Sequence, residues 1–251
     1  MSDFKEEILS KEKVTDKTLN GFIFFFLCIA ICIVGWNILR NRPDSDGAIA
    51  PLRSVLNFNE RLFSGIQSSA HLSKTYPKST ADPNVRKNGT AGMSNGFDPA
   101  SWKLKVVRNA GDTLVVTLDE IKSLPKTEEV FDFKCIEGWS QVTYWGGVKF
   151  SDFVKHFNLG PQSEMKYVGL CTPDNEYYVG IDRASILHPQ TILCYEMNGA
   201  PLPMDQGAPL RLIIPVKYGI KHLKRIGTIT FSDERPRDYW FERGYDYYSG
   251  L

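Results

Sequence analysis

Hydrophobic and polar positions follow three different patterns along this chain. From Gly21 to Leu39 the sequence GFIFFFLCIAICIVGWNIL runs for nineteen residues without a charge. As a helix this stretch would be roughly 28 Å long, which is close to the hydrocarbon thickness of a bilayer. It lacks the polar face that a core helix of a soluble protein would carry. The pattern predicts a transmembrane helix over residues 19–40, with the lipid bilayer contacted by residues 21–39.

A cleaved signal peptide is the main alternative to a retained anchor. The apolar stretch is long for a signal peptide, and it ends in Trp36-Asn37 followed by Arg40 and Arg42, where a cleavage site would have small residues. We therefore expect a single-pass membrane protein. Four lysines precede the stretch and three arginines follow it, so the positive-inside rule leans toward a periplasmic domain. A cytoplasmic domain is the alternative.

The second pattern follows a linker rich in Pro, Asp and Gly. Between Pro51 and Ile66 apolar residues recur at helical spacing, which predicts an amphipathic helix close to the membrane. Its apolar face could dock on the bilayer or on the following domain. Residues 67–98 are rich in Ser, Thr, Gly, Asn and Pro, and they predict a long irregular lead-in that is either part of a site or a plain linker.

The third pattern begins at Trp102 and consists of short runs of β-branched and aromatic residues. Nine such runs are separated by turn sequences, and short helices are expected between them at residues 118–124, 150–157 and 182–187. Strands and helices do not alternate regularly, so the sequence predicts an α+β fold rich in mixed or antiparallel sheet. The predicted division is a polar tail (1–18), a transmembrane helix (19–40), a linker with the juxtamembrane helix and lead-in (41–97) and the α+β domain (98–251).

Composition and motifs exclude several classes of protein. Thirty basic and twenty-nine acidic residues leave a net charge of +1, so the basic face of a general nucleic-acid binder is not expected. No G-x-G-x-x-G and no P-loop sequence is present, which disfavours dinucleotide-binding folds and P-loop enzymes. Three cysteines outside the apolar stretch, with no CxxC pair, indicate neither a zinc ribbon nor a thioredoxin-like motif. The pair Glu128-Glu129 is interpreted as the solvated start of a strand.

Cys135 is the first candidate for chemistry. It stands in the sequence FDFKCIEGWS, where a predicted strand opens into a turn. A thiolate is a soft ligand suited to transition metals, and Gly138 would allow a close approach of the backbone. A buried structural cysteine is the commoner fate of this residue type. From the residue alone, the structural interpretation is favoured.

The second candidate is the stretch GAPLRLIIPVKYGIKHLKR, residues 207–225. It places Arg211 in an apolar strand, where a buried cation must be paired with an anion. A glycine-containing turn with Lys221 and Lys224 follows, and exposed backbone N–H groups beside lysines can cradle a phosphate. A solvated basic loop, with Arg211 paired to a carboxylate, is the alternative. The residues alone leave both interpretations open.

Taken together, these segments resemble the sulfite oxidase-type molybdopterin-binding oxidoreductase family, which includes the catalytic subunit of bacterial protein-methionine-sulfoxide reductase. The resemblance covers about three-fifths of the chain. Its motifs run in order through PASWKLKV (99–106), LDEIKSLPK (118–126), CIEGWS (135–140), WGGV (145–148), NGAPL (198–202), residues 207–224 and YWFERGY (239–245).

The resemblance implies a molybdenum-molybdopterin cofactor, with the metal held by one pterin dithiolene and by Cys135 as the catalytic residue. It also implies that the pterin and its phosphate are contacted by Arg211, Lys221, His222, Leu223 and Lys224. Further cofactor contacts are expected from Gln206, Thr172 and Asn88. The substrate pocket is expected around Cys135, Trp139, Tyr144 and Thr172.

The implied activity is two-electron oxygen-atom transfer on a small or peptidyl S- or N-oxide or a sulfite-like substrate. The implied redox partner is a membrane-bound cytochrome or a quinone-linked protein. The alternative function is a non-catalytic, membrane-anchored binding module that keeps the fold without the cofactor. Exported family members carry a twin-arginine signal, whereas no Arg-Arg pair precedes the apolar stretch here, so the side of the membrane stays open.

Overall fold

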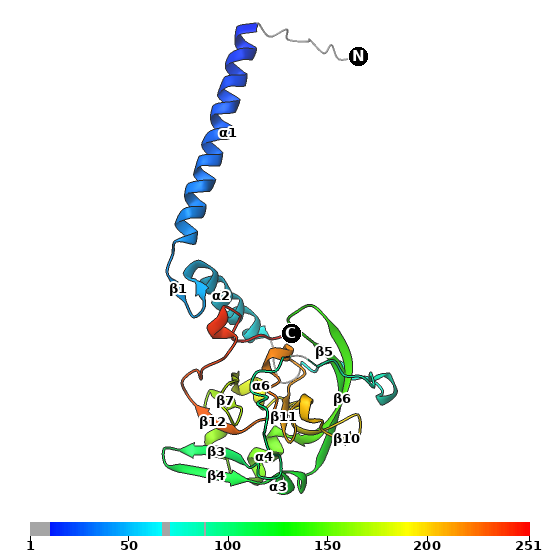
Figure 1. The fold of residues 1–251 in the computed structure, drawn as a ribbon. Coiled ribbons are helices and arrows are strands. Elements are labelled where there is room, and N and C mark those ends of the chain that lie inside the picture. The colour runs from blue at the N-terminus through cyan, green and yellow to red at the C-terminus, as the bar shows by residue number, and fades with distance from the viewer. Residues whose placement is uncertain (1–10, 67–70, 88) are drawn as a thin grey trace.

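The computed structural model of the protein describes residues 11–66, 71–87 and 89–251. Figure 1 shows a long helix, α1 (Lys11–Arg40), that stands away from a domain built around two sheets. The helix is long and apolar enough to cross a membrane, and none of its apolar window is buried in the described structure. It includes the apolar stretch and also residues 11–18, where the sequence predicts a polar tail.

A two-stranded hairpin of β1 (Asp44–Ser45) and β2 (Ala48–Ile49) joins α1 to a second helix, α2 (Ala50–Ile66). A helix therefore forms over residues 51–66, where the sequence predicts an amphipathic one. In Figure 1, α2 lies between the lower end of α1 and the sheet-bearing domain.

The first sheet is antiparallel and carries the segment that contains Cys135. Its order is β10-β9-β6-β5, and β11 also pairs with β9. Glycine at position 147 lets β6 approach β9, since a Cβ there would stand 2.2 Å from the Leu193 carbonyl oxygen. The strands are β5 (Lys126–Lys134), β6 (Ser140–Lys149), β9 (Ile192–Met197), β10 (Ala200–Pro201) and β11 (Arg211–Ile213).

The second sheet is mixed, because β12 runs parallel to β3 and antiparallel to β7. Its order is β4-β3-β12-β7-β8. The nine predicted runs of β-type residues are all confirmed as strands, and the α+β prediction holds. The strands are β3 (Leu104–Asn109), β4 (Asp112–Val116), β7 (Tyr167–Cys171), β8 (Tyr178–Asp182) and β12 (Thr228–Ser232).

Short helices fill the connections between strands. A capping box begins α3, because the Thr117 hydroxyl accepts from the Glu120 N–H while the Glu120 carboxylate accepts from the Thr117 N–H. Phe150 and Phe153 of α4 are fully buried in the main hydrophobic core. The α-helices are α3 (Leu118–Lys122), α4 (Phe150–His156), α5 (Gly160–Ser163) and α6 (Arg183–Ile186), and the 3₁₀ turns are η1 (Lys78–Thr80), η2 (Met204–Gln206), η3 (Gly219–Lys221) and η4 (Phe241–Arg243).

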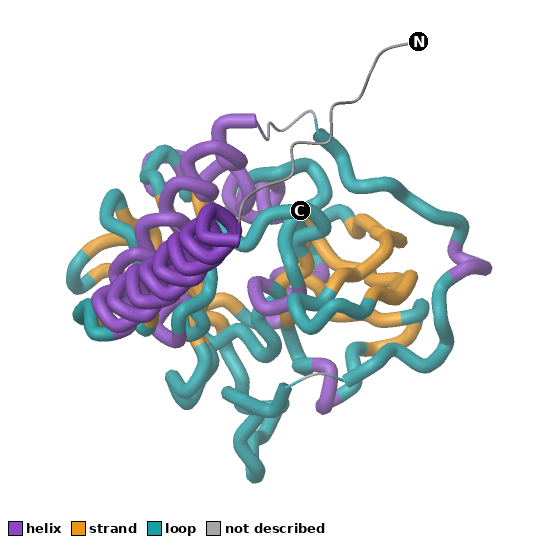
Figure 2. The backbone as a smooth tube through the Cα atoms, turned by 90° about the horizontal axis from the view of Figure 1, so that it is seen from above, coloured by secondary structure: helices purple, strands orange, loops and turns teal. Residues whose placement is uncertain are grey.

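The lead-in is irregular, as predicted, but it is fastened to the first sheet. The Tyr76 N–H donates to the Val130 carbonyl at 2.9 Å, and the Asp82 N–H donates to the Val142 carbonyl at 3.0 Å. In Figure 2 this part of the chain is the long loop that runs around the outside of the strands. Two of its backbone N–H groups are thus satisfied by β5 and β6, and it is more than a plain linker.

The interpretation of Glu129 as a solvated residue is wrong. Glu129 lies opposite Trp145 in the β5–β6 register and is 7% exposed. Its carboxylate accepts a hydrogen bond from the Gln190 amide at 3.3 Å. Burial raises the pKa of Glu129 to about 7.

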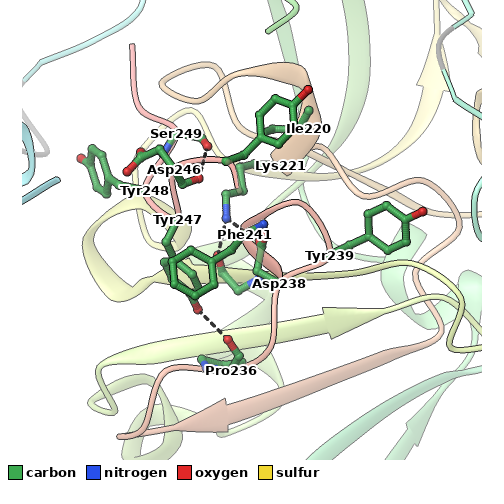
Figure 3. A network of polar contacts seen from close by, with 12 residues as sticks. Ile220, Lys221, Pro236, Asp238, Tyr239, Phe241, Asp246, Tyr247, Tyr248 and Ser249 are labelled. Atoms are coloured by element: carbon green, nitrogen blue, oxygen red, sulfur yellow. Dashed lines mark hydrogen bonds and ion pairs between the residues drawn. The ribbon is translucent and has the colours of Figure 1, made fainter. Parts of the chain in front are cut away.

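A buried ion pair fastens the C-terminal segment to the domain. Lys221 and Asp238 are each 1% exposed, and Lys221 Nζ lies 2.5 Å from Asp238 Oδ2 (Figure 3). The same carboxylate accepts from the Gly180 and Phe241 N–H groups. The contacts of Asp238 therefore connect η3, β8 and η4.

Lys221→Met should lower the free energy of unfolding by about 3–5 kcal/mol, because it leaves the Asp238 carboxylate buried without its cation. The double variant Lys221→Met/Asp238→Asn should recover part of this loss, since the remaining amide carries no charge. Denaturant unfolding of the four proteins of this double-mutant cycle provides the measurement. Additive losses would show that the pair is not coupled.

Glu129→Gln should change how stability depends on pH. Since the pKa of Glu129 is raised from 4.5 to about 7 on folding, the native protein loses stability as pH rises through this window. The variant should avoid this loss, which amounts to about 1–3 kcal/mol at pH 8. Glu128→Gln is the control with the opposite sign, because the hydrogen bond from Lys78 lowers the pKa of Glu128. The same pH dependence of the free energy of unfolding in wild type and Glu129→Gln between pH 4 and 8 would contradict the prediction.

Candidate functional site

A cavity of about 300 Å³ lies between the β5–β6 hairpin and the stretch that contains Arg211. Its walls also include residues of the lead-in and of the C-terminal segment. Segments that are far apart in sequence therefore meet at one site. Trp139 lines this cavity together with Trp240 and Tyr245.

Cys135 occupies the tight turn that joins β5 to β6. Its N–H donates to the Trp139 carbonyl at 2.9 Å, and its carbonyl accepts from the Gly138 N–H at 3.0 Å. Gly138 has a φ of +88°, a conformation that glycine adopts without strain. The Cys135 side chain is 3% exposed, while Phe133 and Ile136 on either side of it line the cavity.

Tyr177 is a partly buried tyrosine in the wall of the cavity. Its hydroxyl donates to the Ile220 carbonyl at 2.7 Å. Burial raises the pKa of Tyr177. Cys135 itself is buried and is not among the described lining residues, whereas its chain neighbours Phe133 and Ile136 are.

Gly219 allows the basic turn to approach the end of β5. A Cβ at this position would stand 2.7 Å from the Phe133 ring. The next side chains of the turn stay close, since the His222 and Phe133 ring centroids are 4.8 Å apart. The basic turn and the strand that precedes Cys135 are thus in direct contact.

Arg211 is a buried cation that no carboxylate neutralises within the described residues. It is 3% exposed, and its Nη1 donates to the Gln206 carbonyl and side-chain oxygens, both at 3.0 Å. Its guanidinium lies 4.5 Å from the centre of the Trp145 ring, and its Nε has no hydrogen-bond partner in the described part of the chain. Burial lowers the pKa of Arg211 to about 10. A buried guanidinium without a carboxylate partner can bind an anionic ligand.

Lys224 and Gln206 reach the same cavity through a close backbone approach. Gly207 has a φ of +102°, and a Cβ on it would stand 2.8 Å from the Lys224 Cβ. Lys224 Nζ donates to the Gly89 carbonyl at 3.1 Å and to the Asp205 carbonyl at 3.4 Å. Burial, and then the charge of Arg211, lower the pKa of Lys224 to about 8.

His222 is neutral near pH 7, because burial and the charge of Arg211 lower its pKa to about 3. Its Nε2 lies 3.2 Å from the Lys217 carbonyl, which can only accept, so Nε2 carries the proton. Nδ1 is then an acceptor, and it has no hydrogen-bond partner in the part of the chain that the structure describes.

The structure gathers some of the predicted site residues and places others elsewhere. Gln206, Arg211, His222 and Lys224 line the cavity, together with Trp139. Lys221 is bound to Asp238, and the Leu223 side chain is part of the main core. The Thr172 hydroxyl serves a turn with Asp174 and Tyr177, and the Tyr144 hydroxyl binds Glu128. Asn88 lies outside the described residues.

Several lining residues were missed in the sequence. Arg86 lies in the irregular lead-in, with its guanidinium 4.6 Å from the centre of the Trp139 ring. Trp240 and Tyr245 come from the C-terminal segment. YWFERGY belongs to the family resemblance and could have marked these two aromatic residues, whereas no local pattern marks Arg86.

The charge of the lining favours an anionic ligand. Among the described lining residues, Arg86, Arg211 and Lys224 are cations, and Glu137 is the one acid. Glu137 Oε2 accepts from the Trp139 indole N–H at 3.1 Å. A phosphate-bearing ligand could supply the charge and the acceptor oxygens that Arg211 lacks.

Comparison with known proteins agrees with this chemistry. The family profile described as an oxidoreductase molybdopterin-binding domain matches residues 91–240. The chain is 32% identical over 209 residues to the putative protein-methionine-sulfoxide reductase subunit YedZ1 of Azospira oryzae, with 82% of this chain and 79% of that protein covered. It is 35% identical over 156 residues to the protein-methionine-sulfoxide reductase catalytic subunit MsrP of Xanthomonas campestris, with 56% of this chain and 48% of that protein covered.

The fold is shared with a solved structure. The crystal structure of the sulfane dehydrogenase SoxCD from Paracoccus pantotrophus superposes with a TM-score of 0.52 at 16% identity, over 66% of this chain and 46% of that chain. This similarity concerns the fold alone. The profile match covers most of the domain, and the cationic lining of the cavity is consistent with it. The chain belongs to the oxidoreductase molybdopterin-binding domain family.

Proposed function

We propose that this oxidoreductase holds a molybdenum-molybdopterin cofactor in the cavity and reduces S-oxides, with peptidyl methionine sulfoxide as the substrate class. The observation that carries the proposal is the buried Arg211 guanidinium, whose contacts in the described residues are neutral oxygens and an aromatic ring. A cation in such a position needs an anion, and the terminal phosphate of the pterin provides one.

Two side chains would hold the phosphate of the cofactor, and a third would contact its pterin. Arg211 would contribute its unpartnered Nε, and Lys224 a second charge. His222 would contribute the acceptor Nδ1, which suits an N–H group of the pterin better than a phosphate oxygen. Gln206 would keep its present role, in which its two oxygens orient the Arg211 guanidinium.

Cys135 would be the protein ligand to molybdenum. Within the described residues no group of three His, Cys, Asp or Glu side chains could hold a metal ion, so we assign the remaining coordination to the cofactor. The turn from Cys135 to Trp139 fixes the backbone of the ligand through two hydrogen bonds. A ligand on a rigid turn is positioned more precisely than one on a long loop.

The cofactor, when bound, supplies two-electron oxygen-atom transfer. In the overall reaction, a sulfoxide, two electrons and two protons give a thioether and water. The chain would bind the substrate through an apolar rim, where Trp139, Trp240 and Ile136 line the cavity. Ile136 is 37% exposed and Tyr245 is 38% exposed, so a side chain on another protein could reach the rim. The relatives named as protein-methionine-sulfoxide reductase subunits support this choice of substrate.

The electrons would come from a membrane-bound partner, a cytochrome or a quinone-linked protein. We infer that α1 is retained as an anchor, which would keep the oxidoreductase in the same plane as that partner. The relative that carries the word subunit in its name supports an assembly of more than one chain. The periplasmic side follows from the lysine bias of the sequence and is part of the same proposal.

Cys135→Ser should remove one sulfur ligand from molybdenum in the cofactor-loaded protein. X-ray absorption at the molybdenum edge should show the loss. Reduction of a methionine-sulfoxide peptide should fall by more than about 100-fold, beyond the effect expected for a group outside the metal coordination shell. Cys171→Ser is the control, because Cys171 lies on β7 and binds the side chain of Asn175. An unchanged sulfur coordination in Cys135→Ser would rule Cys135 out as the ligand.

Arg211→Met should separate cofactor binding from folding. Molybdenum and pterin per chain should fall by at least about tenfold, as expected for the loss of a charge-assisted phosphate contact. The cofactor-free variant should unfold within about 1 kcal/mol of wild type, because removal of a desolvated cation offsets the lost hydrogen bonds.

Arg225→Met is the matched control. Arg225 is 4% exposed, and its guanidinium lies 4.2 Å from the centre of the Phe97 ring and does not line the cavity. It should keep its molybdenum content. Equal metal loss in both variants would contradict a specific role for Arg211, and molybdenum below about one tenth per chain in wild type would favour the non-catalytic module.

A further inference from the structure

Helix α2 has two faces with different surroundings. Arg53, Leu56 and Glu60 lie on the face toward the domain, and Arg53 is only 3% exposed. The face turned away from the domain is open and mostly apolar, with Asn59 as an exposed polar residue on it. Its exposed apolar side chains are Leu52 (49%), Val55 (55%), Phe58 (58%), Leu62 (48%) and Phe63 (53%).

The buried face is locked to the C-terminal segment. Arg53 Nη1 donates to the Tyr245 carbonyl at 2.8 Å, and its Nη2 donates to the Phe241 carbonyl at 3.0 Å. Glu60 forms a two-point ion pair with Arg235 at 2.6 and 3.2 Å. These contacts fix the rotation of α2, so the five apolar side chains cannot turn toward the domain.

The start of α2 lies close to the end of the membrane-spanning candidate α1. The Ala50 N–H donates to the Pro43 carbonyl at 3.0 Å, because the β1–β2 hairpin brings the chain back on itself. Pro43 follows Arg40 by three residues, which limits the separation along the chain to about 10 Å. If α1 spans a bilayer, the headgroup region extends about 5–8 Å beyond the hydrocarbon. The first turn of α2 therefore starts close to the end of α1, next to the headgroup region that α1 would enter.

We propose that the apolar face of α2, formed by Leu52, Val55, Phe58, Leu62 and Phe63, lies in the surface of the lipid bilayer that α1 enters. This proposal rests on the proposed retention of α1. An amphipathic helix with large apolar residues on one face is the element that binds in such a plane. Arg42 and Arg61 are exposed nearby and provide positive charge for anionic headgroups.

The contact would orient the cavity toward the membrane surface in a fixed way. Arg53 holds the carbonyl of Tyr245, and Tyr245 itself lines the cavity. A helix that rests on lipid on one side and grips the cavity wall on the other leaves the domain little freedom to rotate about the linker. The cavity mouth would then keep a constant height above the bilayer, which suits a redox partner embedded in the same membrane.

The test uses the full-length, cofactor-loaded chain in nanodiscs of phosphatidylethanolamine and phosphatidylglycerol. A photoreactive benzoylphenylalanine replaces Phe58 or Phe63, and lipid adducts are measured by mass spectrometry after illumination. The control probe replaces Val115, an exposed apolar residue (49%) on β4, which lies at the end of the domain far from α1 (Figure 1). A probe at Phe24 in α1 reports whether the anchor is in lipid.

Lipid adducts at positions 58 and 63 should exceed those at position 115 by at least about tenfold. In the variant Phe58→Glu/Phe63→Glu, the adduct of a probe at Leu62 should fall by a similar factor, while Val115→Glu leaves it unchanged. Molybdenum content and thermal unfolding verify that each variant is folded.

Three results would overturn the proposal. A lipid adduct at position 24 without one at position 58 would leave the anchor in place and remove the surface contact. Adducts of positions 58 and 63 with a second copy of the chain would replace lipid by self-association. A mature chain that lacks α1 would remove the premise. None of these results bears on sulfoxide reduction, which is measured separately in detergent.

Discussion

The site depends on one electrostatic constraint: a guanidinium is buried in the protein, and no carboxylate among the described residues pairs with it. Arg211 is placed in β11, between strand β9 and the basic turn, and its hydrogen bonds go to the oxygens of Gln206. Desolvation makes this arrangement costly in the absence of a ligand. An anion in the cavity would relieve that cost, so ligand binding and site stability are coupled. A surface arginine would give attraction without such coupling, because water screens it.

Two glycines allow close packing of the backbone around that cation. Gly219 lets the basic turn touch Phe133, which is two residues before Cys135, and Gly207 lets η2 touch Lys224. A side chain at position 219 would clash with the Phe133 ring, and one at position 207 would clash with Lys224. Backbone packing thus fixes the basic turn against the strand that leads to the proposed metal ligand. Fixed spacing is what a rigid cofactor with a metal at one end and a phosphate at the other requires.

Local patterns in the sequence predict the strands well, because alternation and turn chemistry are encoded over a few residues. The turn at Cys135 and the buried position of Arg211 follow from the same local signals. The predictions that fail concern residues whose partners lie far away in the sequence. Glu129 looks like a solvated residue until Gln190 and the β5–β6 register cover it, and Lys221 looks like a phosphate ligand until Asp238 takes its charge. Arg86 joins the site only because the lead-in is fastened to β6.

The C-terminal segment connects these features physically. Asp238 holds it to the domain through Lys221, and three residues later the Phe241 carbonyl accepts from Arg53 of α2. Arg53 binds backbone carbonyls, so its part of the joint between α2 and the domain depends on the path of the segment, while Glu60 binds the Arg235 side chain. The Lys221–Asp238 pair fixes that path, and the same path carries Trp240 and Tyr245 to the cavity. One buried ion pair therefore positions both an aromatic wall of the cavity and helix α2, so loosening it would disturb the two together.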